Sequence, residues 1–217
     1  MYKEQKEKEK RDEEPPLFSY FRDRADWTRS FLPQPFQDLT FDDFVERNPG
    51  KAYAGEAAGE YADALRYGKR HPFIVYGPPG SGKTSLVSAI WNTVAPHVPD
   101  RHELKLAQEC GTADNLAFVR GEELPGILHR QDPRDGPLWA HLQTCFLLVL
   151  DDFDKAPAGN WATDWLGLIN ARVWHKRVPT MITTNTTPAQ FAREYGQPGK
   201  AIVSRWERAC GVFVRLD

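Results

Sequence analysis

From residue 52 onward, short apolar stretches alternate along the chain with stretches that have the 3.6-residue periodicity of helices. Five apolar stretches have the length and composition of buried strands, at residues 73–76, 117–120, 146–150, 180–184 and 212–216. Helices are expected at residues 52–67, 83–94, 122–129, 164–176 and 188–195. This alternation predicts an α/β fold, in which helices flank a parallel five-stranded sheet. Residues 95–115 have two prolines and mixed polarity, and one interpretation of them is an insertion.

The first 39 residues differ in composition from the rest of the chain. Residues 3–14 are almost all charged and have too few apolar side chains to offset the entropy of ordering, so a disordered or transiently helical tail is expected. Residues 17–36 carry six aromatic side chains: Phe18, Tyr20, Phe21, Trp27, Phe31 and Phe36. They form either an arm that packs on its own domain or a segment that docks a partner, because aromatic side chains dominate interface energetics. Residues 40–217 are then one globular domain.

Charge and hydropathy exclude two classes of protein. With 28 Lys and Arg against 30 Asp and Glu, the formal charge is -2, which argues against a general nucleic-acid coat protein and leaves only a local patch for such contacts. The longest strongly apolar run has six residues, at 145–150, whereas a membrane-spanning helix needs about 20. The N-terminus has no apolar segment typical of a secretory signal. A cytoplasmic protein without membrane contact is expected.

The chain contains three cysteines, Cys110, Cys145 and Cys210. They are odd in number and far apart, and none belongs to a paired spacing typical of zinc or redox sites. We interpret all three as buried or inert thiols.

One segment has the pattern G-x-x-x-x-G-K-[ST] between a predicted strand and a predicted helix. In such a loop, backbone N–H groups and the helix N-terminus converge on phosphate oxygens. The lysine adds a positive charge, and the threonine hydroxyl binds Mg²⁺. The alternative, a plain glycine turn, does not explain the flanking strand and helix. The sequence therefore predicts that ATP and Mg²⁺ bind at Gly77, Pro78, Pro79, Gly80, Ser81, Gly82, Lys83, Thr84 and Ser85.

Polar side chains follow two of the predicted strands. Asp151 and Asp152 come directly after strand 146–150, and Asn185 follows strand 180–184. Parallel strands end at the edge of the sheet where open α/β folds bind ligands. We expect Asp151 to hold Mg²⁺, Asp152 to activate the attacking water, and Asn185 to bind the γ-phosphate or that water. The alternatives are loop or helix-cap roles for the two carboxylates and an ordinary turn for Asn185.

These three motifs, in this order, resemble those of P-loop AAA+ ATPases, and over residues 40–216 the chain is most similar to the DnaC-type family of bacterial and phage helicase loaders. The IstB-type transposition ATPases are near relatives. Residues 40–44 and 48–53 resemble the family's entry segment, which implies that Asn48 and Tyr53 lie beside the adenine. Residues 202–206 resemble its Ser-Arg motif, which implies that Arg205 is an arginine finger for a neighbouring subunit, a role that Arg208 is near enough to share. Only 12 residues follow Arg205, so no C-terminal helical lid is expected.

The resemblance also implies single-stranded DNA binding within residues 121–144. Basic and aromatic side chains there suit phosphates and bases, although scattered basic residues more often form a solvated face: His129, Arg130, Arg134, Trp139 and His141. A second basic group is explained by a helix C-terminus, which favours cations: Arg172, His175, Lys176 and Arg177.

The function that these features favour is an ATP-hydrolysing helicase loader, which self-associates or forms a mixed oligomer and helps to place a replicative DNA helicase on single-stranded DNA. An IstB-like helper of a transposase has the same catalytic residues and differs in its partner. Two alternatives of another class are a P-loop small-molecule kinase and a nucleotide-gated binding protein with negligible turnover.

Overall fold

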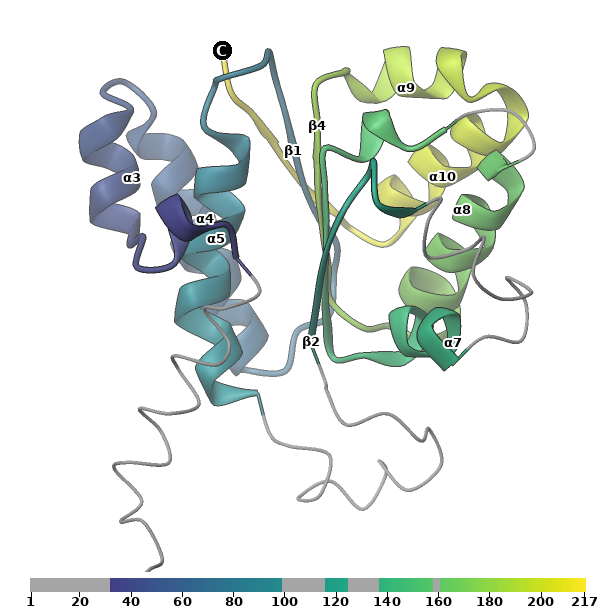
Figure 1. The fold of residues 1–217 in the computed structure, drawn as a ribbon, viewed down its shortest axis with the longest axis horizontal. Coiled ribbons are helices and arrows are strands. Elements are labelled where there is room, and N and C mark those ends of the chain that lie inside the picture. The colour runs from purple at the N-terminus through teal and green to yellow at the C-terminus, as the bar shows by residue number, and fades with distance from the viewer. Residues whose placement is uncertain (1–31, 99–115, 125–136, 158–160) are drawn as a thin grey trace, which may run out of the picture.

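The computed structural model describes residues 32–98, 116–124, 137–157 and 161–217. Its centre is one sheet of five parallel strands in the order β2-β3-β4-β1-β5 (Figure 1). The strands are β1 (Phe73–Tyr76), β2 (Leu116–Arg120), β3 (Leu147–Asp151), β4 (Thr180–Thr184) and β5 (Val212–Arg215). The predicted α/β fold and all five predicted strands are confirmed, each within one residue at either end.

The strands run in one direction, so their carboxyl ends lie together at one edge of the sheet. In the register, Phe73 of β1 pairs with Met181 of β4 and with Val212 of β5, and Leu150 of β3 pairs with Ile182. Every residue of β3 and β4 is buried. Polar residues that follow β1, β3 and β4 therefore reach one common site.

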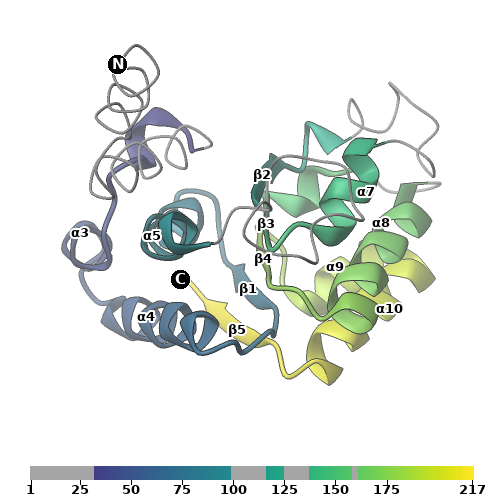
Figure 2. The same ribbon diagram turned by 90° about the horizontal axis from the view of Figure 1, so that it is seen from below.

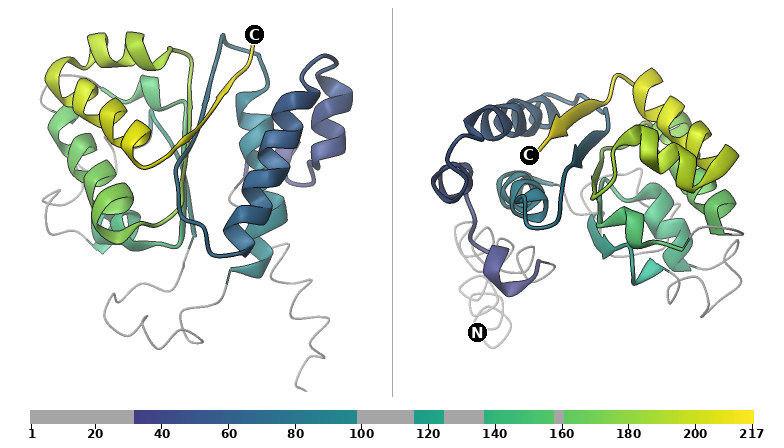
Figure 3. Two further views of the ribbon diagram at one scale, coloured as in Figure 1. Left: turned by 180° about the vertical axis from the view of Figure 1, so that it is seen from behind. Right: turned by 90° about the horizontal axis from the view of Figure 1, so that it is seen from above.

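Helices cover both faces of the sheet (Figures 2 and 3). One face carries α3 (Phe41–Arg47), α4 (Ala52–Arg66) and α5 (Lys83–Val94), and the other carries α7 (Pro137–Thr144), α8 (Trp161–Ile169), α9 (Pro188–Glu194) and α10 (Gly196–Arg208). Alternate residues of β1 divide between the two cores: Phe73 and Val75 pack with the first group of helices, and Ile74 packs with the second. The sheet is thus the middle of three layers.

Three of the helix predictions need correction. Residues 164–176 are not one α-helix, because α8 ends at Ile169 and continues as a π-helix, η5 (Asn170–Lys176). The predicted helix at 188–195 is followed directly by a second helix, α10, which was not among the helices expected from the sequence pattern. Glu122 and Glu123 lie in a turn, and 125–129 fall outside the described residues. Of the unassigned stretch 95–115, residues 95–97 form a 3-10 helix and 99–115 lie outside the described part.

The first described residues, 32–39, lie against α5. Leu32 and Leu39 are buried, and the Asn92 side chain donates hydrogen bonds to the carbonyls of Phe36 and Leu39 at 2.9 and 3.0 Å. This end of the aromatic segment therefore packs on its own domain. The tail at 3–14 and the remaining aromatic residues lie outside the described part, and the division at residue 39 stays a prediction.

Two smaller sequence expectations concern thiols and membranes. Of the thiols expected to be buried or inert, Cys145 is buried. Cys210 is exposed at a left-handed turn, so for it only the expectation of an inert thiol stays a prediction, and Cys110 lies outside the described residues. None of the helices in the described ranges is long and apolar enough to cross a membrane.

Candidate nucleotide-binding site

The loop after β1 has a backbone path that requires glycine at two positions. Gly77 has φ 155°, and a Cβ atom there would lie 1.8 Å from the Leu216 carbonyl oxygen. Gly82 has φ 95°, and its Cβ would lie 2.9 Å from the Asn48 side-chain oxygen. The loop then leads into α5, so the N–H groups of the first turn of that helix remain available for an anion.

Lys83, the first residue of α5, is held inside this loop. Its side chain is buried, and Nζ donates hydrogen bonds to the carbonyls of Gly77 and Pro78 at 2.9 and 2.8 Å. Burial lowers the pKa of Lys83, and nearby carboxylates, with Asp152 first, offset part of this effect. A desolvated ammonium group that binds only neutral carbonyls is an energetically favourable partner for a phosphate.

Ser81 is a second group of the loop that suits an anionic partner. Its hydroxyl is buried and has no hydrogen-bond partner among the described residues. The Ser81 carbonyl is fixed from outside the loop by Lys51, whose Nζ lies 2.8 Å from that oxygen. Lys51 was not among the predicted site residues, although it lies inside the segment 48–53 that the resemblance singled out.

Asp151 and Thr84 meet at the carboxyl end of β3. The Thr84 hydroxyl lies 3.0 and 3.1 Å from the two carboxylate oxygens of Asp151, and the Thr183 hydroxyl donates to Oδ1 of Asp151 at 2.7 Å. Burial raises the pKa of Asp151, and the hydrogen bonds from Thr183 and Thr84 oppose that shift. A buried carboxylate beside a hydroxyl is an oxygen donor set that suits Mg²⁺, so the residues present fit the expected cation.

Thr183 also positions the next residue of the motif. Its hydroxyl accepts a hydrogen bond of 2.7 Å from the backbone N–H of Asp152, which has a left-handed conformation with φ 49°. One buried threonine therefore holds both aspartates. Thr183 was not among the predicted site residues, because a strand with three threonines does not reveal which of them faces the site.

Two neighbours of the predicted catalytic residues were also missed. Oδ2 of Asp152 lies 2.6 Å from Nζ of Lys155. Asp154 accepts from the Asn185 backbone N–H at 2.8 Å and from its side-chain amide at 2.9 Å, which sets the orientation of that amide. The signal was present in the run D-D-F-D-K at 151–155, but only the three-dimensional contacts assign the pairs.

A cleft of about 400 Å³ connects these groups. It joins the loop, the start of α5 and the ends of β3 and β4, so it unites the predicted Lys83, Thr84, Asp152 and Asn185. The arm contributes one wall through Phe36. The lining residues are Phe36, Pro79, Gly80, Gly82, Lys83, Thr84, Ser85, Asp152, Lys155 and Asn185.

Seven predicted residues are not among the lining: Gly77, Pro78, Ser81 and Asp151, which belong to the loop and strand end described above, and Asn48, Tyr53 and Arg205. Asn48 donates to the Phe44 carbonyl at 2.9 Å and lies against Gly82. Tyr53 is half exposed, and its hydroxyl binds the Arg215 carbonyl. Arg205, on α10, donates to the Asn170 side chain and to the Ala201 carbonyl of its own chain. The adenine contacts and the arginine finger therefore stay predictions.

The structure contradicts part of the predicted DNA surface. Trp139 is buried and packs against Trp165 with 6.4 Å between the ring centroids, so its ring is not available for stacking on a base. His141 is also buried, with Nε2 3.2 Å from the Leu116 carbonyl. His129, Arg130 and Arg134 lie outside the described residues.

Arg172 is a further correction. A cation-favouring helix C-terminus was expected to explain this residue, but it is fully buried and its guanidinium binds backbone carbonyls in the core. Its Nη1 donates to the carbonyls of Leu142 and Cys145 at 2.7 and 3.0 Å.

Comparisons with known proteins agree on the fold. No protein-family model matches the chain. A curated relative, the chromosomal replication initiator protein DnaA of Thermotoga petrophila, is 38% identical over 82 residues, which is 37% of this chain and 18% of the relative. The match thus spans about a fifth of the relative's length.

Solved structures match over most of the chain. A structure of DnaI has a TM-score of 0.64 at 20% identity, covering 88% of this chain and 96% of that one. A structure of the DnaC helicase loader has a TM-score of 0.64 at 18% identity, and the match covers 85% of this chain and 100% of that one. A structure of the replication initiator DnaA, bound to AMPPCP and single-stranded DNA, has a TM-score of 0.62 at 19% identity. That match covers 86% of this chain and 51% of the DnaA chain. The expected likeness to DnaC-type proteins is confirmed in the fold, because the chain shares the parallel α/β fold of these DnaI and DnaC structures.

Proposed function

We propose that this protein binds Mg²⁺ and ATP in the cleft and hydrolyses ATP. The observation that carries the proposal is the meeting of Lys83, the Thr84–Asp151 contact and Asp152 at the carboxyl edge of the sheet. A phosphate would replace the loop carbonyls as the partner of Lys83 and would satisfy the Ser81 hydroxyl. Asp151 and Thr84 would hold Mg²⁺, which neutralises charge on the phosphate oxygens.

The remaining side chains have roles that suit water attack on the γ-phosphate. Asp152 lines the cleft and is the group that accepts a proton from water. Asn185, oriented by Asp154, donates its amide toward the phosphate or the water. A neighbouring subunit would supply Arg205 against the charge that develops in the transition state.

The biological role that fits best is that of a helicase loader. The DnaC helicase loader matches this chain over its own full length, and a DnaA structure of the same fold holds an ATP analogue and single-stranded DNA. We propose that the chain associates with itself or with a replicative helicase and brings that helicase to single-stranded DNA. An IstB-like transposase helper would have the same cleft and a different partner.

The substitution Asp152→Asn tests the ATPase. We expect Mg²⁺ and ATP to bind as in the wild type, because Lys83, Thr84 and Asp151 remain, whereas turnover should fall about 10²- to 10⁴-fold. Binding is measured with a fluorescent ATP analogue and turnover by phosphate release. Asp63→Asn, at the far end of α4, is the matched control. Unchanged turnover in Asp152→Asn would contradict the assignment of the base.

The partner is tested with purified proteins. A replicative helicase from the native host should co-migrate with the chain in the presence of ATP, and the mixture should retain more helicase on circular single-stranded DNA than helicase alone. If the chain instead co-migrates with a transposase and not with the helicase, the IstB-like alternative holds.

A further inference from the structure

The edge of the sheet opposite to the cleft carries an unusual surface. Two segments enter the sheet there side by side: residues 67–72 lead into β1, and residues 174–179 lead into β4 (Figure 1). Strands β1 and β4 are direct neighbours, with Phe73 paired to Met181. We name this surface the basic edge, and it consists of Tyr67, Lys69, Arg70, Trp174, Lys176 and Arg177.

The basic edge has positive charge without compensation. All four of its Lys and Arg side chains belong to exposed residues, and segments 67–72 and 171–179 contain no Asp or Glu. Within the described part of the chain, none of these four cations forms an ion pair with a carboxylate. Burial lowers the pKa of the adjacent His71, and the charge of Lys69 lowers it further. The basic edge is therefore locally positive, although the chain as a whole has a net charge of -2.

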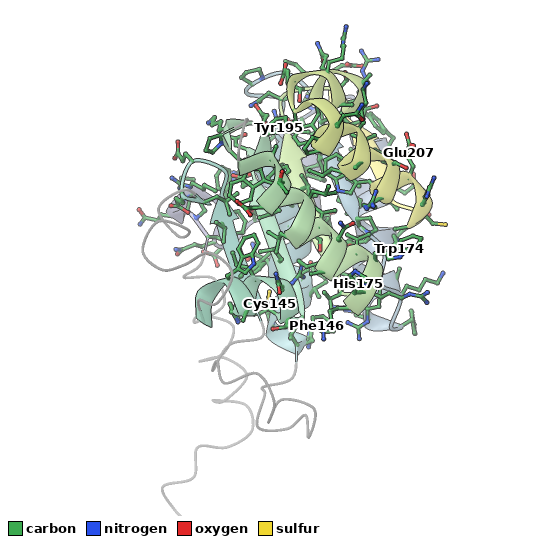
Figure 4. All side chains as sticks on the ribbon, turned by 90° about the vertical axis from the view of Figure 1, so that its right-hand side faces the viewer. Cys145, Phe146, Trp174, His175, Tyr195 and Glu207 are labelled. Carbon is green, nitrogen blue, oxygen red and sulfur yellow. The ribbon has the colours of Figure 1, made fainter. Side chains whose placement is uncertain are left out.

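Aromatic rings lie among these cations. In the described residues only three large apolar side chains are exposed, and two of them, Tyr67 at 87% and Trp174 at 52%, belong to the basic edge. Figure 4 shows Trp174 and His175 toward the same end of the molecule as Phe146, and Tyr195 toward the opposite end. Exposed rings beside cations offer both a stacking face and a positive charge to a ligand.

The basic edge is also held rigidly. Arg70 places its guanidinium 4.2 Å from the centre of the Phe146 ring, which joins the segment before β1 to the residue before β3. The buried Arg172 donates to the carbonyls of Leu142, Cys145 and Pro179 at 2.7, 3.0 and 2.6 Å. These bonds anchor η5 just before Trp174. The backbone segments that carry the basic edge are therefore anchored to the core, which reduces the entropy lost on binding.

We propose that the basic edge binds a single strand of nucleic acid, with phosphates on Lys69, Lys176 and Arg177 and bases stacked on Trp174 and Tyr67. Positive charge combined with exposed rings is the chemistry by which proteins hold single strands without sequence preference. A duplex hides its base faces, and an acidic peptide gains little from the rings. The basic edge would be the place where the single-stranded DNA of the proposed function binds. This inference rests on the proposed function only in naming the single strand as DNA.

The test measures binding of a fluorescein-labelled oligothymidylate by anisotropy, without ATP. Trp174→Ala should raise the Kd about 5- to 150-fold, the usual worth of one stacked base, and Trp174→Phe should restore part of the affinity. Lys176→Gln should weaken binding and reduce the slope of log K against log salt by about 0.7. Lys200→Gln, an exposed cation on α10, is the matched control and should change neither. All of these side chains are exposed, and thermal unfolding checks that each variant folds.

Three results would overturn the proposal. Unchanged affinity in both Trp174→Ala and Lys176→Gln would exclude the basic edge as the site. Equal losses of affinity for polyglutamate would make it a general anion surface, and equal affinity for duplex DNA would exclude base stacking. Failure of the ATPase proposal is distinguishable, because Lys83→Ala lies at the other edge of the sheet and should leave oligothymidylate binding unchanged.

Discussion

Nζ of Lys155 lies 2.6 Å from Oδ2 of Asp152, the carboxylate that we propose as the base. The two residues are one turn apart in the 3-10 helix that follows β3, and both line the cleft. The pairing raises the pKa of Lys155 through its hydrogen bond and charge interaction with Asp152. Lys155 occupies one carboxylate oxygen of Asp152, which leaves only the other oxygen free to approach a water, so this pair restrains the proposed reaction.

Lys155→Met should therefore raise basal ATP turnover. The pair is partly exposed, with 50% of the Lys155 side chain and 27% of the Asp152 side chain accessible, so the gain should be about 1.4- to 5-fold, which corresponds to an exposed ion pair. Phosphate release at saturating ATP measures it, with Lys69→Met as the control. A fall in turnover would indicate that Lys155 contacts the phosphates instead.

Lys83→Ala should weaken ATP binding about 10- to 150-fold, because the charge-assisted hydrogen bonds to the phosphates are lost. The fold should be unaffected, since Lys83 binds only loop carbonyls and its charge is desolvated. Equilibrium binding of a fluorescent ATP analogue and urea unfolding give the two quantities, and Lys200→Ala controls for loss of a surface cation. Wild-type affinity in Lys83→Ala would refute the phosphate-loop assignment.

Thr183→Val should reduce the free energy of unfolding by about 1–3 kcal/mol. The substitution keeps the β-branched shape but leaves the Asp152 N–H and one oxygen of Asp151 without their buried partner. Urea unfolding measures the loss. Thr163→Val, exposed on α8, should change stability by much less. Equal effects of the two substitutions would mean that the Thr183 hydroxyl does not hold the aspartates.

Protonation of Asp151 should increase the free energy of unfolding of the metal-free protein. Its folded-state pKa is raised above the ordinary 3.8, so the folded state binds this proton more tightly than the unfolded state. This carboxyl therefore destabilises the fold above its raised pKa, and that effect is relieved as the pH falls through the raised value toward 3.8. With a chelator present, the free energy of unfolding of the wild type should rise, relative to that of Asp151→Asn, as the pH is lowered. Urea unfolding of both proteins across that range measures it, and a relative loss would contradict the shift.

Arg205→Ala should leave ATP binding intact and reduce turnover about 10³- to 10⁵-fold, if Arg205 acts in a neighbouring subunit's cleft. Its partners in its own chain are the Asn170 side chain and the Ala201 carbonyl, and both are exchangeable for a phosphate. Arg193→Ala, an exposed arginine on α9, is the matched control.

Mixing the Arg205→Ala and Lys83→Ala chains tests whether Arg205 acts on a neighbouring subunit. Arg205→Ala retains the phosphate loop and Lys83→Ala retains the arginine, so mixed assemblies should regain part of the activity that each lacks alone. Wild-type turnover per molecule should also rise with protein concentration. Turnover that is independent of concentration, with no rescue between chains that associate, would return Arg205 to a surface role.

The strands and the phosphate loop were predictable because their signals are local. A buried parallel strand is a nearly continuous apolar run, and a phosphate loop needs glycines, lysine and threonine at fixed spacings in one segment. Asp151, Asp152 and Asn185 were predictable for a related reason, since each directly follows a strand and parallel strands end at one edge. The sequence by itself therefore determined the sheet and most of the cleft.

Only the tertiary structure decided which side chains pair and which are buried. Thr183 joins both aspartates, and Lys155 pairs with Asp152, because β3 and β4 are neighbours. Trp139 was expected on a DNA-binding surface and Arg172 at a helix C-terminus, but both lie in the core. There Trp139 packs against the ring of Trp165, and Arg172 donates to the Pro179 carbonyl. The basic edge joins residues about 100 positions apart, because β1 inserts beside β4. Such contacts follow from strand order, which hydrophobic periodicity does not encode.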